Sequence, residues 1–276
     1  MRLNRDLFQM LIGAAVMAMS CSVHATTYNE AVMAANPHAY FTMDETSGTT
    51  AFNQVGFPAG ENGTYVNGPT LGAAANGQLG TAVSFDGTND LVRILDPHNP
   101  TDYTLEAWVK LDALPTSFAN ILWRTDAGES GSFSHILQVL GDGRFVHYTF
   151  DGGTRSVTST TVAQVGRWYH VVGVYHPGAT GVGFMSIYIN GVLEQNWNFG
   201  VLNNPWTGGN RWLIGDTHAS GPFLKASVDE VAIYHSLLSA NTIAAHFAAA
   251  TIPEPATATL GLLALGGLML RRRRMA

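Results

Sequence analysis

A period of two in the hydrophobic pattern runs through the middle of the chain. In the segment YTLEAWVKL, residues 103–111, every second side chain is apolar, and the others, which include Glu106 and Trp108, form the opposite face. Such alternation is typical of a β-strand. Asn190-Gly191 between MSIYI and VLEQNW predicts a tight hairpin. Similar patterns predict strands at 39–44, 63–68, 82–85, 91–94, 120–124, 133–139, 145–150, 155–160, 167–175, 184–190, 192–197, 212–215 and 226–234.

Two short helices are predicted at the ends of this strand-rich region. Thr27-Tyr28-Asn29-Glu30 has the spacing of a capping box, which predicts a helix from there to about Ala35. Ser239 is a good N-cap for a second helix that reaches about residue 250. Many short strands with frequent glycine turns, flanked by two helices, predict an all-β sandwich or jelly roll of two antiparallel sheets.

The first 25 residues have the pattern of a signal peptide. Arg2 and Arg5 precede an apolar stretch at 11–19, and Val23-His24-Ala25 places small residues at the −3 and −1 positions of a cleavage site. We therefore expect the mature chain to begin at Thr26. Two alternatives are a buried N-terminal helix and a lipoprotein acylated at Cys21, although Ala18 replaces the leucine usual in such boxes.

The last 25 residues combine a Pro-Glu-Pro motif, a short uncharged run and four arginines. The run at 256–270 would reach about 22 Å as a helix, less than the ~30 Å hydrocarbon core of a bilayer. This order at Pro253, Glu254 and Pro255 resembles the PEP-CTERM sorting signal of Gram-negative bacteria. The resemblance implies transient inner-membrane insertion, cleavage near the motif by an exosortase-type protease, and delivery to the cell surface or exopolysaccharide matrix. The alternative is an ordinary single-span anchor.

Charge and cysteine content narrow the function of residues 26–251, which are long enough for one all-β domain. The whole chain has a formal charge of −6, and six of its basic residues lie in the two terminal segments. An acidic domain lacks the basic surface that nucleic acid requires, so no nucleic-acid partner is expected. The single cysteine, Cys21, precedes the domain, so no disulfide is expected within it.

Six segments in order resemble the laminin G-like, concanavalin A-like jelly roll of bacterial secreted proteins. They are AYFTMDETSGTT, GTAVSFDGTNDLVRI, YTLEAWVKL, GRWYHVVGVYHPGATG, MSIYINGVLE and ASVDEVAIYHSLLSANTIAAHF. The resemblance covers about residues 27–249. It implies two antiparallel sheets packed as a sandwich, a structural calcium ion in many members, and a glycan- or protein-binding role.

Asp229 is the most informative carboxylate of the domain. It alternates with Val231 and Ile233, which predicts the apolar face, where an unpaired carboxylate is costly. The resemblance implies a calcium site made by Asp229 and Asp44 with the Asp86-Gly87 turn. The alternatives are that Asp229 pairs with a buried hydroxyl or an arginine, and that Asp86 only forms an Asx turn.

A sugar site is expected at an exposed aromatic side chain with amides beside it. Trp206 fits this description, because Asn203, Asn204 and Asn210 surround it in a loop, although it could equally plug that loop. Glu106 and Trp108 are further candidates on the non-core face of their strand, unless another segment covers them.

Catalytic motifs are missing from the sequence. It contains no His-Glu-x-x-His, no Gly-x-Ser-x-Gly, and none of the Glu-x-Asp-x-x-Glu spacing of laminarinase-type glycosidases. We therefore expect no enzyme activity and no catalytic residues, and interpret the chain as an exported carbohydrate-binding or adhesion module whose partner is a glycan or exopolysaccharide. The alternatives are a polysaccharide lyase or hydrolase with carboxylates from several strands, and a structural matrix protein that binds other proteins.

Overall fold

The computed structural model describes residues 26–56, 61–126, 128, 133–150, 152–178, 182–200, 208–216 and 222–251. Within them, Tyr28–Thr251 form one compact unit. Thr26 is exposed, whereas Ala25 and the tail motif Pro253, Glu254 and Pro255 lie outside the described residues, so both processing sites stay predictions. None of the described helices is long and apolar enough to cross a bilayer.

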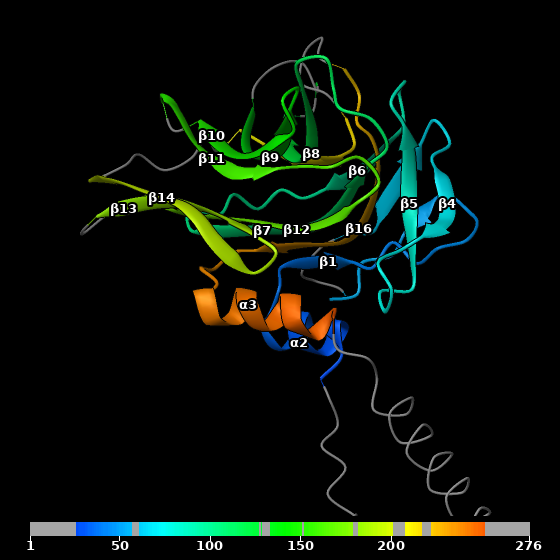
Figure 1. The fold of residues 1–276 in the computed structure, drawn as a ribbon, viewed down its shortest axis with the longest axis horizontal. Coiled ribbons are helices and arrows are strands. Elements are labelled where there is room, and N and C mark those ends of the chain that lie inside the picture. Colours follow the sequence, from blue (N-terminus) through cyan, green and yellow to red (C-terminus); the bar gives the residue numbers. More distant parts are fainter. Residues whose placement is uncertain are drawn as a thin grey trace, which may run out of the picture. The chain divides into compact units, whose positions relative to one another are not determined.

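Two antiparallel sheets pack face to face and confirm the predicted sandwich (Figure 1). The helix-side sheet contains β1 (Ala39–Phe41), β4 (Thr70–Ala74), β5 (Thr81–Asp86), β7 (Tyr103–Leu111), β12 (Trp168–His176), β13 (Gly183–Ile189), β14 (Val192–Gly200) and β16 (Lys225–Tyr234). The far sheet contains β2 (Thr50–Ala51), β3 (Gly63–Val66), β6 (Leu91–Leu95), β8 (Phe118–Thr125), β9 (Phe133–Leu140), β10 (Arg144–Phe150), β11 (Thr154–Val162) and β15 (Arg211–Ile214).

The strand order shows that the chain crosses repeatedly between the sheets. The helix-side sheet has the order β14-β13-β12-β7-β16-β5-β4, with β1 paired to β16. The far sheet has the order β11-β10-β9-β8-β15-β6-β3-β2. Because of this order, β14 and β11, each at one end of its sheet, contact each other at the same side of the sandwich (Figure 1).

The predicted alternation in β7 separates two hydrophobic layers. Leu105 and Val109 lie in the core between the sheets, whereas Trp108 lies in a second cluster on the opposite face of the helix-side sheet. That second layer exists because both helices cover this face. The apolar faces of the sheet and of the helices are thus buried against each other, which is what stabilises such short helices.

The two helices begin and end close to their predicted positions. They are α2 (Tyr28–Ala34) and α3 (Ala240–Ala249), and both lie beneath the helix-side sheet in Figure 1. The Ser239 side chain accepts a hydrogen bond from the Thr242 backbone N–H, which confirms the predicted cap of α3.

The sequence pattern missed β2 and β4. Strand β2 has two residues, too few to show a period. Strand β4 is TLGAA, without a β-branched residue after Thr70, and its register with β5 shifts between Thr70 and Ala73. Gly72 has φ of 71° within that shift, a conformation that side-chain-bearing residues rarely adopt.

Candidate functional site

An exposed tryptophan stands on the strand that ends the helix-side sheet. Trp197 on β14 is 45% exposed, and its ring centroid lies 3.7 Å from that of Phe199. The Arg155 guanidinium of β11 lies 5.5 Å from the centroid of Phe199. Trp197 is paired directly with Met185, a core residue, so both side chains point to the inner face of their sheet. We name Trp197, Phe199 and Arg155 the aromatic rim, because they lie where the two sheet edges meet.

Side chains of β14 hold the neighbouring edge of β11 in place. Glu194 Oε2 accepts hydrogen bonds from the backbone N–H groups of Thr160 at 2.7 Å and Thr161 at 2.9 Å. Gln195 Oε1 accepts one from Thr158 N–H at 2.6 Å. Burial would raise the pKa of Glu194, but hydrogen bonds from the Thr161 hydroxyl and from the Thr160 and Thr161 backbone N–H groups lower it below the ordinary value. These backbone N–H groups at the edge of the far sheet thereby have hydrogen-bond partners. The same contacts hold β14 and β11, the two strands that carry the aromatic rim, against each other.

Sequence reasoning missed Trp197 because it lies in a predicted strand, where tryptophan usually belongs to a core. One signal was present in the segment EQNWN, where polar side chains occupy the positions on both sides of the tryptophan. A strand that is polar on both faces cannot be buried on both faces, so its aromatic residue is a surface candidate.

The predicted loop site falls mostly outside the described residues. Trp206, Asn203 and Asn204 lie in 201–207, so their role stays a prediction. Asn210 is exposed, and its backbone extends the far sheet: its carbonyl accepts a hydrogen bond from Asp96 N–H, and its N–H donates to the Thr125 carbonyl.

The expected ligand contacts at Glu106 and Trp108 are wrong, because the helices cover both side chains. Glu106 is 0% exposed and Trp108 is 1% exposed. Trp108 packs in a tilted arrangement on His170 and stacks on Phe247 of α3. The period-two pattern correctly placed them off the central core, but it could not show that a helical layer closes that face.

Glu106 is instead the acceptor of a buried hydrogen-bond network that ties the helices to the sheet. It accepts hydrogen bonds from Tyr28 Oη of α2 at 2.8 Å, His170 Nε2 at 2.7 Å, Tyr234 Oη at 2.9 Å and His246 Nδ1 of α3 at 3.0 Å. Burial alone would raise the pKa of Glu106, but the two histidines lower it below the ordinary value. The carboxylate is therefore ionised and fully used, with no capacity for a ligand.

Asp229 is buried but lies elsewhere than predicted. Strand β16 bulges between Asp229 and Ala232, with Glu230 at φ of 52°. Asp229 is paired with Trp108, whose side chain lies on the helix-covered face, whereas Val231 lies in the core. The bulge therefore breaks the alternation on which the sequence prediction depended.

The surroundings of Asp229 fit a cation. It is 0% exposed, and neither carboxylate oxygen has a hydrogen-bond partner among the described residues. Burial, then the charges of Glu230 and Asp44, raise its pKa well above the ordinary value. An orphaned buried carboxylate is the kind of oxygen ligand that calcium prefers, but no group of three histidine, cysteine or carboxylate ligand atoms found among the described residues includes Asp229.

The structure does not bring the whole predicted calcium set together. Asp44 accepts a hydrogen bond from Thr81 N–H, at the start of β5. Asp86 and Gly87 lie at its other end, where Lys225 is the cross-strand partner of Asp86. Asp229 lies four positions after Lys225 along the strand, which is about 13 Å. Asp86 and Gly87 are therefore wrong as ligands of that site.

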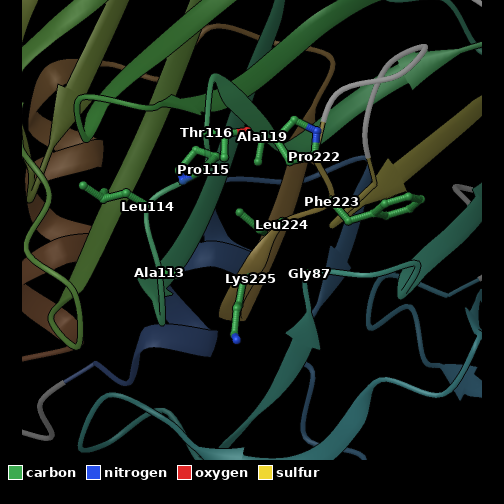
Figure 2. A pocket seen from close by; sticks show the side chains of 10 residues that line it. All are labelled: Gly87, Ala113, Leu114, Pro115, Thr116, Ala119, Pro222, Phe223, Leu224 and Lys225. Carbon is green, nitrogen blue, oxygen red and sulfur yellow. The ribbon is translucent and has the colours of Figure 1, made fainter.

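The Asp86-Gly87 turn has other neighbours that do not suit a cation. Asp86 Oδ1 accepts a hydrogen bond from Thr88 N–H at 2.7 Å, which is the Asx turn of the alternative reading. Beside Gly87 is a pocket of about 160 Å³, lined mainly by apolar side chains with Lys225 at its edge (Figure 2). It is small beside the roughly 300–1,000 Å³ of typical ligand pockets.

Comparison with known proteins fixes the family. A family model described as the concanavalin A-like lectin/glucanases superfamily matches residues 86–244, more than half of the chain. The chain belongs to this superfamily. Curated proteins give no sequence match.

Solved structures with this concanavalin A-like fold come from several sources. Domain 4 of AbnA, a GH43 extracellular arabinanase from Geobacillus stearothermophilus solved with arabinotriose, is 19% identical with a TM-score of 0.57, over 76% of this chain and 97% of that one. Trypanosoma rangeli sialidase is 14% identical with a TM-score of 0.54, over 76% of this chain but 32% of that one. The binding domain of botulinum neurotoxin serotype D is 14% identical with a TM-score of 0.55, over 76% and 51%.

These comparisons correct the expectation that the chain is not an enzyme. The solved structures that share its concanavalin A-like fold include a domain of an arabinanase and a sialidase, so the fold class includes glycoside hydrolases. The missing Glu-x-Asp-x-x-Glu spacing excludes only one arrangement of catalytic carboxylates on one strand.

Proposed function

We propose that the chain binds carbohydrate at the aromatic rim. The observation that carries this proposal is the half-exposed Trp197, backed by Phe199 and by the Arg155 guanidinium. An indole face covers the apolar C–H face of a sugar, while a guanidinium donates to hydroxyl or carboxylate oxygens. Support comes from the solved structures of the same fold, which include complexes with arabinotriose and sialic acid.

A glycan array that includes arabino-oligosaccharides and sialylated glycans tests this proposal on the full-length chain. Trp197→Ala should weaken binding by roughly five- to 150-fold, because stacking a large aromatic side chain contributes about 1–3 kcal/mol. Leu193→Ala is the matched control, since Leu193 is an exposed apolar residue of the same strand. Equal losses in both variants, or unchanged binding in Trp197→Ala, would remove the aromatic rim as the site.

Calcium belongs to the same proposal as a structural ion at Asp229. Its two unpartnered oxygens would bind the ion, with Asp44 supplying further negative charge nearby. When bound, calcium would neutralise the buried carboxylates and hold the bulge of β16 against the start of β5.

We also propose that the chain is exported and sorted to the cell surface or exopolysaccharide matrix. The support is the sequence alone: the signal-peptide pattern before Thr26 and the Pro253-Glu254-Pro255 motif ahead of a short apolar run and arginines. A glycan-binding domain released there would meet polysaccharide as its natural partner, and would act in adhesion or matrix organisation.

A further inference from the structure

Three chain segments distant in sequence meet at one corner of the sandwich. His38 precedes β1, His235 follows β16 and Asp96 follows β6. The pairing of β1 with β16 explains the first contact, because His38 N–H donates to the Ile233 carbonyl at 2.8 Å. Asp96 N–H continues the ladder of the far sheet by donating to Asn210. One ligand atom from each of His38, Asp96 and His235 lies within 4.8 Å of the others.

The two imidazoles stack on each other at this corner, close to the Asp96 carboxylate. Their rings stack with centroids 3.6 Å apart at 15°. Nε2 of His235 is buried without a hydrogen-bond partner among the described residues, whereas Nε2 of His38 faces the Asp96 carboxylate, 3.2 Å from its Oδ2. A neutral imidazole nitrogen with a free lone pair is what a transition metal ion binds.

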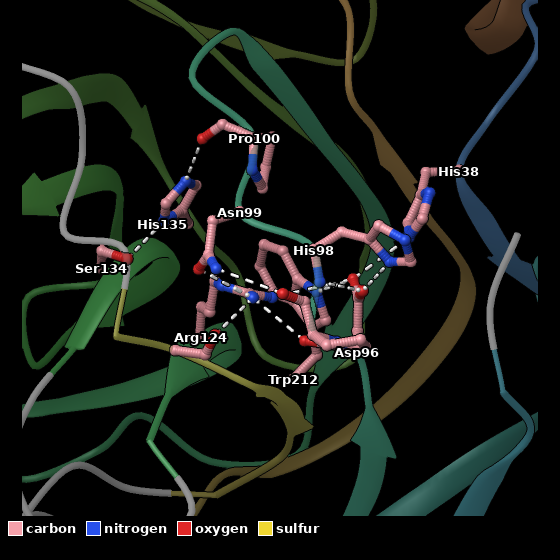
Figure 3. Close-up of polar contacts among 11 residues, drawn as sticks. His38, Asp96, His98, Asn99, Pro100, Arg124, Ser134, His135 and Trp212 are labelled. Atoms are coloured by element: carbon pink, nitrogen blue, oxygen red, sulfur yellow. Dashed lines mark hydrogen bonds and ion pairs between the residues drawn. The ribbon is translucent and has the colours of Figure 1, made fainter.

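The carboxylate between them is already oriented. Asp96 is 3% exposed, and its Oδ2 lies 3.2 Å from His38 Nε2 and accepts a hydrogen bond from Trp212 Nε1 at 2.9 Å. Its Oδ1 accepts a hydrogen bond from the His98 backbone N–H at 2.9 Å. Figure 3 shows Asp96 among the labelled side chains of His38, His98, Arg124 and Trp212.

Two further side chains, Arg124 and His98, lie next to Asp96. Arg124 is fully buried, and its Nη1 lies 3.7 Å from Asp96 Oδ2. The positive charge of Arg124 offsets the negative charge of Asp96. The site therefore attracts a cation less strongly than Asp96 would without Arg124. The His98 side chain, 54% exposed with its ring 5.0 Å from that of His38, also contacts the carboxylate, because its Nδ1 lies 2.9 Å from Asp96 Oδ1.

We propose that His38, His235 and Asp96 bind a divalent transition metal ion, and that zinc matches this donor set best. Two imidazole nitrogens and one carboxylate oxygen are ligands that zinc accepts in a tetrahedral site, with solvent in the fourth position. Calcium is a poor match for these ligands, because it prefers oxygen ligands alone. The site is distinct from Asp229 in both its residues and its ligand chemistry, and it is independent of glycan binding.

Zinc titration of the untagged full-length chain, stripped with chelator and followed by calorimetry, tests the site. We expect one equivalent to bind, and expect His235→Ala and His38→Ala each to weaken binding by at least about tenfold, since the loss of even an outer-shell partner costs 10- to 100-fold. The matched control is His176→Ala, because His176 contacts Asp102 at 2.8 Å in a more exposed pair, and no third metal-ligating side chain joins this pair among the described residues.

A spectroscopic measurement keeps the proposal testable if a variant fails to fold. Cobalt(II) added to the wild-type chain should give the intense visible bands of a tetrahedral site, and zinc should displace them. Failure to bind stoichiometric zinc, absence of these bands, or an equal loss of affinity in His176→Ala would each overturn the assignment.

Discussion

Removing the Glu106 carboxylate should be among the most destabilising single changes in this domain. Four donors converge on it, from Tyr28, His170, Tyr234 and His246, and no solvent reaches it. Hydrogen bonds to a charged group contribute about 1.5–3 kcal/mol each, but donors that share one acceptor do not add fully. Glu106→Ala should therefore lower the free energy of unfolding by about 3–5 kcal/mol, the usual cost of breaking a buried charged pair.

Glu106→Gln separates the charge from the packing. The amide keeps the shape and one acceptor oxygen, but its NH₂ group meets donors, so we expect an intermediate loss of about 1–3 kcal/mol. Urea unfolding at pH 7, followed by tryptophan fluorescence, measures these differences. The control is Glu61→Ala, because Glu61 is exposed, and a surface change of this kind stays within about 0.5 kcal/mol. A loss below about 1 kcal/mol in Glu106→Ala would refute the view that this network holds the helical layer.

Three further outcomes follow from the structure. Burial lowers the pKa of His147 to about 3 in the folded state, whereas a histidine in the unfolded chain takes up a proton as pH falls below about 6.5. The free energy of unfolding should therefore drop by about 2 kcal/mol between pH 7 and pH 5 through this residue. Urea unfolding of His147→Asn should not show this drop. Asp229→Asn should abolish the increase in melting temperature that calcium causes, because the amide lacks the negative charge and one of the two oxygen ligands; a calcium shift kept in the variant would place the ion elsewhere. Mass spectrometry of the surface-exposed protein should find a C-terminus near Pro255, and a peptide containing Arg271 would exclude cleavage.

Most of the fold could be predicted because its signals are local. The alternation in β7, the Asn190-Gly191 turn and the Ser239 cap each depend on a few neighbouring residues, and each is found as predicted. The positive φ values of Asn190 and Gly191, 52° and 78°, are those that such a hairpin turn requires.

The sites were harder to predict because they depend on long-range contacts and on irregular backbone. The bulge at Glu230 places Asp229 on the helix-covered face of the sheet instead of the core face, and no local sequence pattern predicts this bulge. The cluster of His38, Asp96 and His235 joins positions almost 200 residues apart, and only the pairing of β1 with β16 brings its two histidines together.

The placement of both helices on one face has a mechanical consequence. Helix α2 opens the compact unit Tyr28–Thr251 and α3 closes it, so a tether at either end pulls on the helical layer before it reaches a strand. Tyr28 and His246 hold the same carboxylate, so force applied between the ends loads these hydrogen bonds first. Once the helices detach, the load passes to β1 and β16, which pair with each other, whereas the aromatic rim on β14 is separated from β16 by three strands.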